Sequence, residues 1–289
     1  MIRLTRVLHP ISTARSVGAR LAKAWNGRRL RGQLRGVRRT SRELCWCGGA
    51  LGPFPWHGSY GVCRSCGTFV NRIPPVAEDI QKIYSLGPYW HTRQRLRGFP
   101  AIEDRADLYV SDGRLTKWLD LVAAWSRPGL AIEIGCAPGA LLAELARRGY
   151  RCLGVEASED TAAWVSERTG VPVVTGTFPH VDLPGCDLFL AFDVLEHSPW
   201  PREFMARAAE LLADGGVAII QTAVERYGFT PPFGDRSDIF DDLEHLFLFT
   251  QTAIERLAES AGLQVVNCSQ RVFLAGELVV LRKPEGADR

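Results

Sequence analysis

From Leu130 onward, short apolar runs alternate with helix-like stretches, and no other pattern in the chain restricts its fold as strongly. This is the order of parallel βαβ units, in which a helix follows each strand and returns the chain to the same edge of the sheet. The predicted strands are Leu130–Ile134, Cys152–Val155, Val171–Val174, Leu188–Phe192, Val217–Gln221, Gln264–Asn267 and Val272–Leu281. The predicted helices are Leu141–Arg148, Thr161–Arg168, Glu203–Leu212 and Ala253–Ala261. The chain is therefore predicted to be an α/β protein built on a mostly parallel sheet.

A tight turn of small residues follows the first of these strands. Gly135 and Gly139 enclose it, and glycine permits backbone conformations and a close ligand approach that a side chain would block. Glu156 ends the second strand, 21 residues after Gly135, where a carboxylate can accept hydrogen bonds from both hydroxyls of an adenosine ribose. Among ligands that contain adenosine, NAD is the main alternative to consider. Its Gly-x-Gly-x-x-Gly fingerprint fits the spacing from Gly135 to Gly139 poorly.

Taken together, these features resemble the class I S-adenosylmethionine-dependent methyltransferases, which have a Rossmann-like fold. The resemblance covers about residues 129–283 and rests on Glu133–Gly139, Glu156, Asp187–His197 and Leu211–Gly216. It implies that residues 129–285 form a methyltransferase domain with S-adenosylmethionine as its cofactor. The residues it assigns to the cofactor are Glu133 and Gly135 at the methionine end, Ala137 and Gly139 in the turn, Glu156 at the ribose, Thr177 and Phe178 beside the adenine, and Asp193 and Val194 near the sulfonium. Pro138 departs from the commoner all-glycine turn.

Two groups of acidic residues and histidines are the candidates for chemistry. Asp193–His197 follows the fourth predicted strand, and Asp241–His245 precedes the last predicted helix. The arrangement is similar to that of metal-dependent O-methyltransferases of the ubiquinone-biosynthesis and small-RNA 2′-hydroxyl types. That resemblance implies Asp193, Glu196, His197 and His245 as ligands of Mg²⁺ or another divalent ion, with Asp193 replacing the more usual Glu.

The same residues allow two other interpretations. His197 or His245 can act as a metal-free general base, since neutral imidazole titrates near physiological pH. Alternatively, Glu196 and His197 only begin a helix and His245 only anchors a loop. The catalytic candidates are therefore His197, His245 and Glu196.

Four of the eight cysteines lie close together in the sequence. Cys45-x-Cys47 and Cys63-x-x-Cys66 offer four thiolates on two tight knuckles, as a structural zinc ribbon requires, although the first pair is one residue shorter than usual. A redox thiol pair is the alternative, and no thioredoxin-like context surrounds either pair. We expect a closed, structural zinc site in a small module of residues 43–75.

Residues 76–128 are predicted to be a helical linker or cap between this module and the methyltransferase domain. A ribbon, then Ile83–Trp90, then the methyltransferase domain is similar to a bacterial family that accompanies polysaccharide and secondary-metabolite pathways, and some of its members methylate sugars on nucleotide carriers. The aromatic and histidine residues that could contact a substrate ring, or fill the core of their module, are Trp56, His57, Tyr60, Tyr89, Trp90 and His91.

Residues 1–42 form a strongly basic arm. They hold eleven Arg and one Lys without an acidic residue, which leaves −9 for the rest of a chain whose net charge is +3. Such an arm can bind an anionic membrane surface or nucleic acid, can be a transit peptide, or can be a flexible solvated tail. No apolar stretch approaches the length of a membrane span, and no secretory pattern opens the chain, so a cytoplasmic location, peripheral to a membrane where the arm touches one, is expected.

The expected function is methyl transfer to a hydroxyl of a sugar or other small metabolite, such as a nucleotide sugar or a glycan. Two alternative functions belong to other classes of protein. The zinc module and the basic arm could serve an RNA ribose methyltransferase, although the acidic body would repel phosphate. The chain could also be a non-catalytic scaffold that keeps the fold.

Overall fold

The computed structural model describes residues 28–55, 57–225, 239–273 and 276–286. Its strands are β1 (Leu51–Pro53), β2 (Tyr60–Cys63), β3 (Phe69–Asn71), β4 (Leu130–Ile134), β5 (Arg151–Glu156), β6 (Val173–Thr175), β7 (Cys186–Phe192), β8 (Leu212–Glu225), β9 (Phe247–Thr250), β10 (Gln264–Phe273) and β11 (Gly276–Arg282). Its helices are η1 (Ala77–Asp79), α2 (Ile80–Ile83), η2 (Leu86–Arg93), α3 (Gln94–Leu96), η3 (Ile102–Asp104), α4 (Arg105–Ser111), α5 (Arg114–Trp125), α6 (Ala140–Arg147), α7 (Glu159–Thr169), η4 (Leu195–His197), α8 (Pro201–Leu211) and α9 (Gln251–Ser260). Among the described residues, no helix is both long and apolar enough to cross a membrane.

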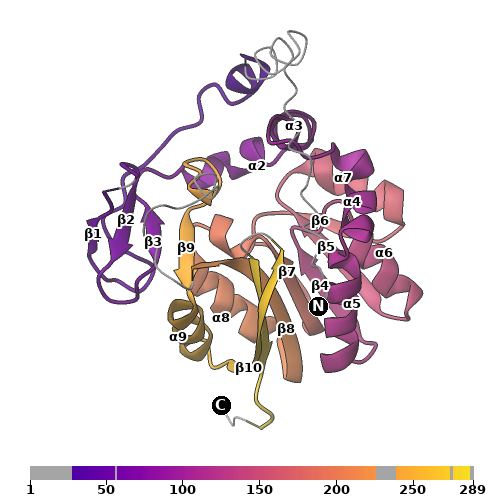
Figure 1. Ribbon diagram of the computed structural model, residues 1–289. Helices are drawn as coiled ribbons and strands as arrows, with labels where there is room; N and C mark the ends of the chain where they lie inside the picture. The colour runs from indigo at the N-terminus through magenta and orange to yellow at the C-terminus, as the bar shows by residue number, and fades with distance from the viewer. Residues whose placement is uncertain (1–27, 56, 226–238, 274–275, 287–289) are drawn as a thin grey trace, which may run out of the picture.

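The centre of the molecule is the parallel sheet that the sequence predicts. Strands β8, β7, β4, β5 and β6 lie in this order, and each pair is parallel. Helices cover both faces, with α5, α6 and α7 on one side and α8 and α9 on the other (Figure 1). Leu188 and Leu190 of β7 pack in the cluster with α5 and α6, while Phe189 and Ala191 pack in the cluster with α8 and α9. Because both faces are buried, the strand reads as a continuous apolar run.

The C-terminal part of the sheet differs from the prediction. The segment Val272–Leu281 was expected to be one strand, but the chain forms a hairpin in which β10 and β11 are antiparallel and Phe273 faces Gly276. β11 then pairs antiparallel with β8. The sequence hides the reversal because apolar residues stand on either side of it, Val272 and Phe273 before it and Leu278–Leu281 after it.

A short strand that the sequence did not indicate, β9, joins the cysteine module to this sheet. β9 lies parallel to β8 and antiparallel to β3, with Val70 facing Phe247, and β3, β2 and β1 continue outward from it. Figure 1 shows β1, β2 and β3 at one side of the molecule, beyond β9. The module of residues 43–75 is therefore an extension of the main sheet.

The last residues of the basic arm are bound to the folded body. Arg38 forms an ion pair with Asp79, its Nε lying 3.2 Å from Oδ2, and Arg39 Nη1 donates to the carbonyl oxygens of Ile73 and Asp242, both at 2.8 Å. The Arg42 guanidinium lies 4.6 Å from the centre of the Phe247 ring. Residues 1–27, which carry most of the arm, lie outside the described residues.

Candidate active site

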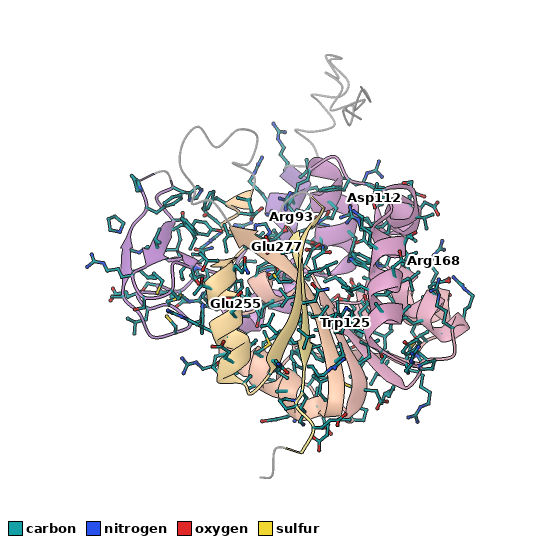
Figure 2. All side chains as sticks on the ribbon, turned by 60° about the horizontal axis from the view of Figure 1, so that its bottom comes forward. Arg93, Asp112, Trp125, Arg168, Glu255 and Glu277 are labelled. Atoms are coloured by element: carbon teal, nitrogen blue, oxygen red, sulfur yellow. The ribbon has the colours of Figure 1, made fainter. Side chains whose placement is uncertain are left out.

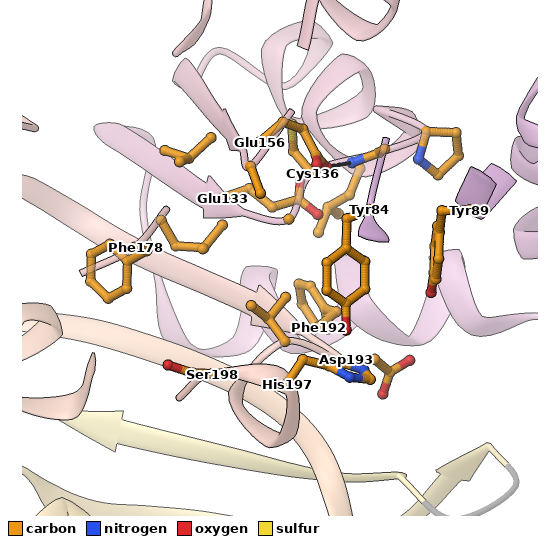
Figure 3. Close-up of a pocket in the computed structure, with 18 of the residues that line it drawn as sticks. Tyr84, Tyr89, Glu133, Cys136, Glu156, Phe178, Phe192, Asp193, His197 and Ser198 are labelled. Atoms are coloured by element: carbon orange, nitrogen blue, oxygen red, sulfur yellow. Dashed lines mark hydrogen bonds between the residues drawn. The ribbon is translucent and has the colours of Figure 1, made fainter. Parts of the chain in front are cut away.

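A pocket opens at the carboxyl ends of β4, β5 and β7, the edge where open α/β sheets bind ligands. The segments that line it from the sheet are 133–138, 155–157, 176–178 and 192–194. Side chains of the helical segment 80–118 close it from the other side, Tyr84 and Tyr89 among them (Figure 3). Eight of the nine residues assigned to the cofactor line this pocket, namely Glu133, Gly135, Ala137, Glu156, Thr177, Phe178, Asp193 and Val194.

The two glycines of the turn have different roles. Gly135 has φ 66°, and a Cβ there would lie 2.7 Å from Val194 Cγ2, so only glycine fits beside the pocket. Gly139, the ninth residue assigned to the cofactor, does not line the pocket. A Cβ on Gly139 would meet Thr169 Cγ2 at 2.5 Å, so this glycine allows α6 and α7 to pack closely.

Two buried carboxylates lie next to the turn. Glu156 Oε1 accepts a hydrogen bond of 2.7 Å from the backbone N–H of Ala137, and burial raises the pKa of Glu156 to about 7 (Figure 3). Glu133 is 5% exposed, its Oε2 has no hydrogen-bond partner within the described structure, and burial, together with the charge of Glu156, raises its pKa. An unpartnered buried carboxylate oxygen is costly, so Glu133 is suited to bind a cationic or hydrogen-donating ligand group.

Asp193 belongs to a chain of hydrogen-bonded side chains rather than to the histidine cluster. It has φ 55°, an uncommon conformation for a residue other than glycine. Its Oδ1 accepts from Gln221 Nε2 at 2.9 Å, and Gln221 Oε1 accepts from Trp118 Nε1 at 2.9 Å. The structure thus holds Asp193 at the pocket wall through two side chains that the sequence did not single out.

Glu196, His197 and His245 come together although 48 residues separate the two histidines. Each offers a ligand atom, and these atoms lie within 4.8 Å of one another, whereas Asp193, expected as a fourth ligand, is not in the group. The Nδ1 atoms of His197 and His245 are hydrogen-bonded to the carbonyl oxygens of Glu244 (2.7 Å) and Ile239. A carbonyl can only accept, so each Nδ1 carries a proton, and in the neutral form of each ring Nε2 has the lone pair that can bind a metal ion or accept a proton.

Glu196 is the buried carboxylate of this group. It is 2% exposed, and its oxygens accept from Thr222 Oγ1 at 2.7 Å and from the backbone N–H of Ala223 at 3.3 Å. Burial raises the pKa of Glu196, and burial together with the neighbouring His197 lowers the pKa of His245. Two imidazoles held through Nδ1 and one anchored carboxyl group form a donor set that suits a divalent ion.

Two arginines that the sequence analysis missed hold the loop that carries His245. Arg93 binds both Asp241 and Glu244, and Arg97 Nη1 lies 3.1 Å from Glu244 Oε2. Arg93 is labelled in Figure 2. Asp241 and Glu244 therefore pair with arginines instead of a metal. No local pattern announces these pairs, because their partners lie about 150 residues apart in sequence.

The aromatic candidates divide between the pocket and the cysteine module. Tyr89 and Trp90 line the pocket, together with Tyr84, whose ring centre lies 5.8 Å from that of His197. His91 instead binds Glu103 at 2.8 Å. Tyr60 is buried, and its hydroxyl donates to the carbonyl oxygen of His245 at 2.6 Å. His57 packs at 5.2 Å from the Tyr60 ring, and Trp56 lies outside the described residues.

The four clustered cysteines converge as the spacing predicts. Sγ distances are 3.6 Å from Cys45 to Cys66 and 3.5 Å from Cys47 to both Cys63 and Cys66. Ligands 2.3 Å from a tetrahedral zinc ion are about 3.8 Å apart, so these distances suit zinc. Gly48 and Gly67 adopt φ 83° and 74° where the knuckles turn. The half-buried Arg42, whose pKa burial lowers to about 10, is attracted to Cys45 and offers positive charge to the thiolates.

Comparison with known sequences agrees with this geometry. The methyltransferase domain family matches residues 109–267. A ubiquinone biosynthesis O-methyltransferase from Caulobacter sp. (strain K31) is 34% identical over 99 residues, which is 32% of this chain and 39% of the relative. The chain thus spans about two fifths of the length of the curated relatives it matches.

Solved structures show the same fold. A chain from the complex of the Haloferax volcanii Trm112 methyltransferase activator with a methyltransferase superposes with a TM-score of 0.52 at 12% identity, over 64% of this chain and 96% of that one. The PH0226 protein from Pyrococcus horikoshii OT3 gives 0.51 at 17% identity, over 61% and 91%. Because the family match covers more than half of the sequence, the chain belongs to the methyltransferase domain family, and it has the Rossmann-like fold of the class I S-adenosylmethionine-dependent enzymes.

Proposed function

We propose that the protein transfers a methyl group from S-adenosylmethionine to a hydroxyl of a small metabolite, with a sugar as the first class to test. The observation that carries the proposal is one pocket in which the Gly135 turn and two buried carboxylates face the wall that holds His197. A methyl donor and an acceptor must lie side by side for in-line displacement. In this pocket, the residues suited to the donor face the residue suited to the acceptor hydroxyl, His197.

The residues around the turn fit the cofactor. Glu133 has an unpartnered buried oxygen that suits the amino group at the methionine end, and Glu156, which is held by the backbone N–H of Ala137, lines the pocket where its carboxylate can accept from ribose hydroxyls. Gly135 leaves the space that a side chain would fill. When bound, the cofactor supplies the methyl group and its leaving group, so the protein has only to align the acceptor and remove its proton.

The histidine cluster supports transfer to oxygen. Hydroxyl acceptors need a base or a metal ion because they ionise poorly at neutral pH, and the O-methyltransferase name of the Caulobacter relative points the same way. We propose that Glu196, His197 and His245 hold a divalent ion, which would supply Lewis-acid chemistry to the acceptor hydroxyl. The hydrogen bonds of the Nδ1 atoms fix the two imidazole rings and leave the Nε2 atom of each ring to bind a metal ion or to act as a metal-free base.

We also propose that the four clustered cysteines bind a structural zinc ion. All four positions of a tetrahedron are then filled by protein, which leaves no site for substrate.

Replacing Glu156 by alanine should weaken binding of S-adenosylmethionine by at least about tenfold, because the ribose loses a charge-assisted hydrogen bond. Calorimetric titration with S-adenosylmethionine and with NADH measures this. The exposed Glu159, three residues further along, gives the matched control Glu159→Ala, which should bind as the wild type does. No binding of S-adenosylmethionine by the wild type would overturn the proposal, and tight binding of NADH would replace it with a dehydrogenase.

Cofactor affinity should rise with pH by up to about tenfold between pH 6 and pH 8, because Glu156 titrates near 7 and its ionised form binds the ribose hydroxyls better. Titrations at several pH values, with Glu156→Gln as the variant that should lose the dependence, measure it. For the stability of the ligand-free protein, the same raised pKa has the opposite effect: stability falls as the pH rises, because the folded state binds the proton more tightly than the unfolded state does. Its contribution to stability is complete below about pH 4.5 and is lost as the pH rises through about 7.

A further inference from the structure

The pocket wall contains a buried arginine that belongs neither to the residues assigned to the cofactor nor to the histidine cluster. Arg105 is the first residue of α4, lines the pocket and is 7% exposed. Its Nε lies 3.5 Å from the Tyr109 hydroxyl, and its Nη1 is buried without any hydrogen-bond partner in the described part of the chain. A buried guanidinium normally has a carboxylate beside it, because taking an unpaired charge out of water is costly.

The other arginine of the pocket wall is already neutralised. Arg114 Nη2 lies 2.7 Å from Asp112 Oδ2, and its Nε bonds both oxygens of the same carboxylate. Arg105 instead lies against aromatic rings, 4.4 Å from the centre of Phe99 and 5.9 Å from that of Trp90. Rings stabilise a cation but leave its hydrogen-bond donors free. Arg105 therefore has N–H donors that can bind an anionic group of a ligand.

A continuous row of rings connects this arginine to the histidine cluster. The Tyr84 ring lies 5.8 Å from His197 and 5.1 Å from Tyr89, and Tyr89 lies 5.1 Å from Trp90, which contacts Arg105. Tyr84, Tyr89 and His197 face the same space in Figure 3. A ring-shaped acceptor lying along this row would place its reacting hydroxyl toward His197 and a distant substituent toward Arg105.

We propose that Arg105 is the specificity-determining residue for an acid group, a carboxylate or a phosphate, on the acceptor. The inference rests on the proposed methyl transfer and narrows its acceptor to hydroxyl-bearing rings with an acidic substituent. The guanidinium matches either acid with two parallel N–H···O bonds, which a neutral acceptor cannot accept with equal strength. The carboxylate of the cofactor is the other possible source of the same chemistry, and the experiment separates the two.

The experiment compares the wild type with Arg105→Gln, Arg105→Lys and the exposed control Arg95→Gln. S-adenosylhomocysteine is titrated first. The loaded proteins are then titrated with two matched pairs of probes, 3,4-dihydroxybenzoate against catechol and glucuronate against glucose. We expect the wild type to bind the acid of at least one pair about tenfold more tightly than its neutral partner. Arg105→Gln should lose that preference, Arg105→Lys should keep part of it, and all four proteins should bind S-adenosylhomocysteine within about twofold of one another.

Two results would overturn the inference. One is a loaded wild type without preference for the acid in either pair. The other is a tenfold or greater loss of S-adenosylhomocysteine affinity in Arg105→Gln, which would assign the arginine to the cofactor carboxylate. Failure of the proposed function itself looks different, because the wild type would then not bind S-adenosylhomocysteine at all.

Discussion

Replacing His245 by alanine is expected to slow methyl transfer by about a thousandfold while the affinity for S-adenosylmethionine stays within about twofold of the wild-type value. The two effects separate because His245 is a member of the Glu196–His197–His245 group but is not among the residues that line the cofactor pocket. Turnover is measured with the acceptor that reacts fastest in a survey of hydroxyl-bearing sugars and phenols. The half-exposed His180, outside this group, gives the control His180→Ala, which should retain wild-type turnover.

Metal binding distinguishes the two roles open to the histidines. If the group binds a divalent ion, titration of the loaded wild type with Mn²⁺ should show one ion per chain, and both His245→Ala and Glu196→Gln should lose it. If a histidine is a metal-free base, Mn²⁺ should not bind, chelators should have no effect, and Glu196→Gln should keep most of the activity. Unchanged turnover in His245→Ala, with and without a chelator, would contradict both roles.

The sequence predicted those parts of the structure that depend on local pattern. Apolar runs bounded by turns identified β4, β5 and β7, because strands covered by helices on both faces of a sheet are built mainly from apolar residues. The spacing from Gly135 to Glu156 follows from one βα unit, so it placed both residues at the same edge of the sheet. The same reasoning does not separate Gly135 from Gly139, which does not line the pocket, because a glycine required for helix packing and one required for a ligand look the same in the sequence.

Features that depend on distant partners could not be predicted in this way. β9 is four residues long and is a strand only because β3 and β8 pair with it on either side. Arg93 and Arg105 look alike in the sequence, but one meets two carboxylates and the other meets none in the described residues. Burial and pairing are set by tertiary contacts, which composition and periodicity do not contain.

Replacing Cys66 by serine should remove zinc and lower the melting temperature by about 10–20 °C, because a loss of about 5 kcal/mol shifts a chain of this size by that amount. The effect should extend to the histidine group, since the cysteine module holds its loop. The Tyr60 hydroxyl binds the His245 carbonyl at 2.6 Å, Asn71 Nδ2 donates to the Asp242 carbonyl at 3.0 Å, and the Thr250 hydroxyl donates to the Cys66 carbonyl at 3.0 Å.

Three measurements on Cys66→Ser make this prediction specific: zinc by elemental analysis, the melting temperature, and titrations with Mn²⁺ and S-adenosylhomocysteine. Cys152 on β5 is a half-buried thiol outside the cluster, so Cys152→Ser should keep zinc and change the melting temperature little. Tyr60→Phe should keep zinc but weaken Mn²⁺ binding, because it removes only the hydroxyl that links the module to His245. We expect S-adenosylhomocysteine to bind every folded variant, since its pocket is lined by other elements. If the wild type contains no zinc and Cys66→Ser melts at the same temperature as the wild type, the cysteines do not bind a structural metal. If Cys66→Ser still binds Mn²⁺, the loop that carries His245 keeps its conformation without the cysteine module.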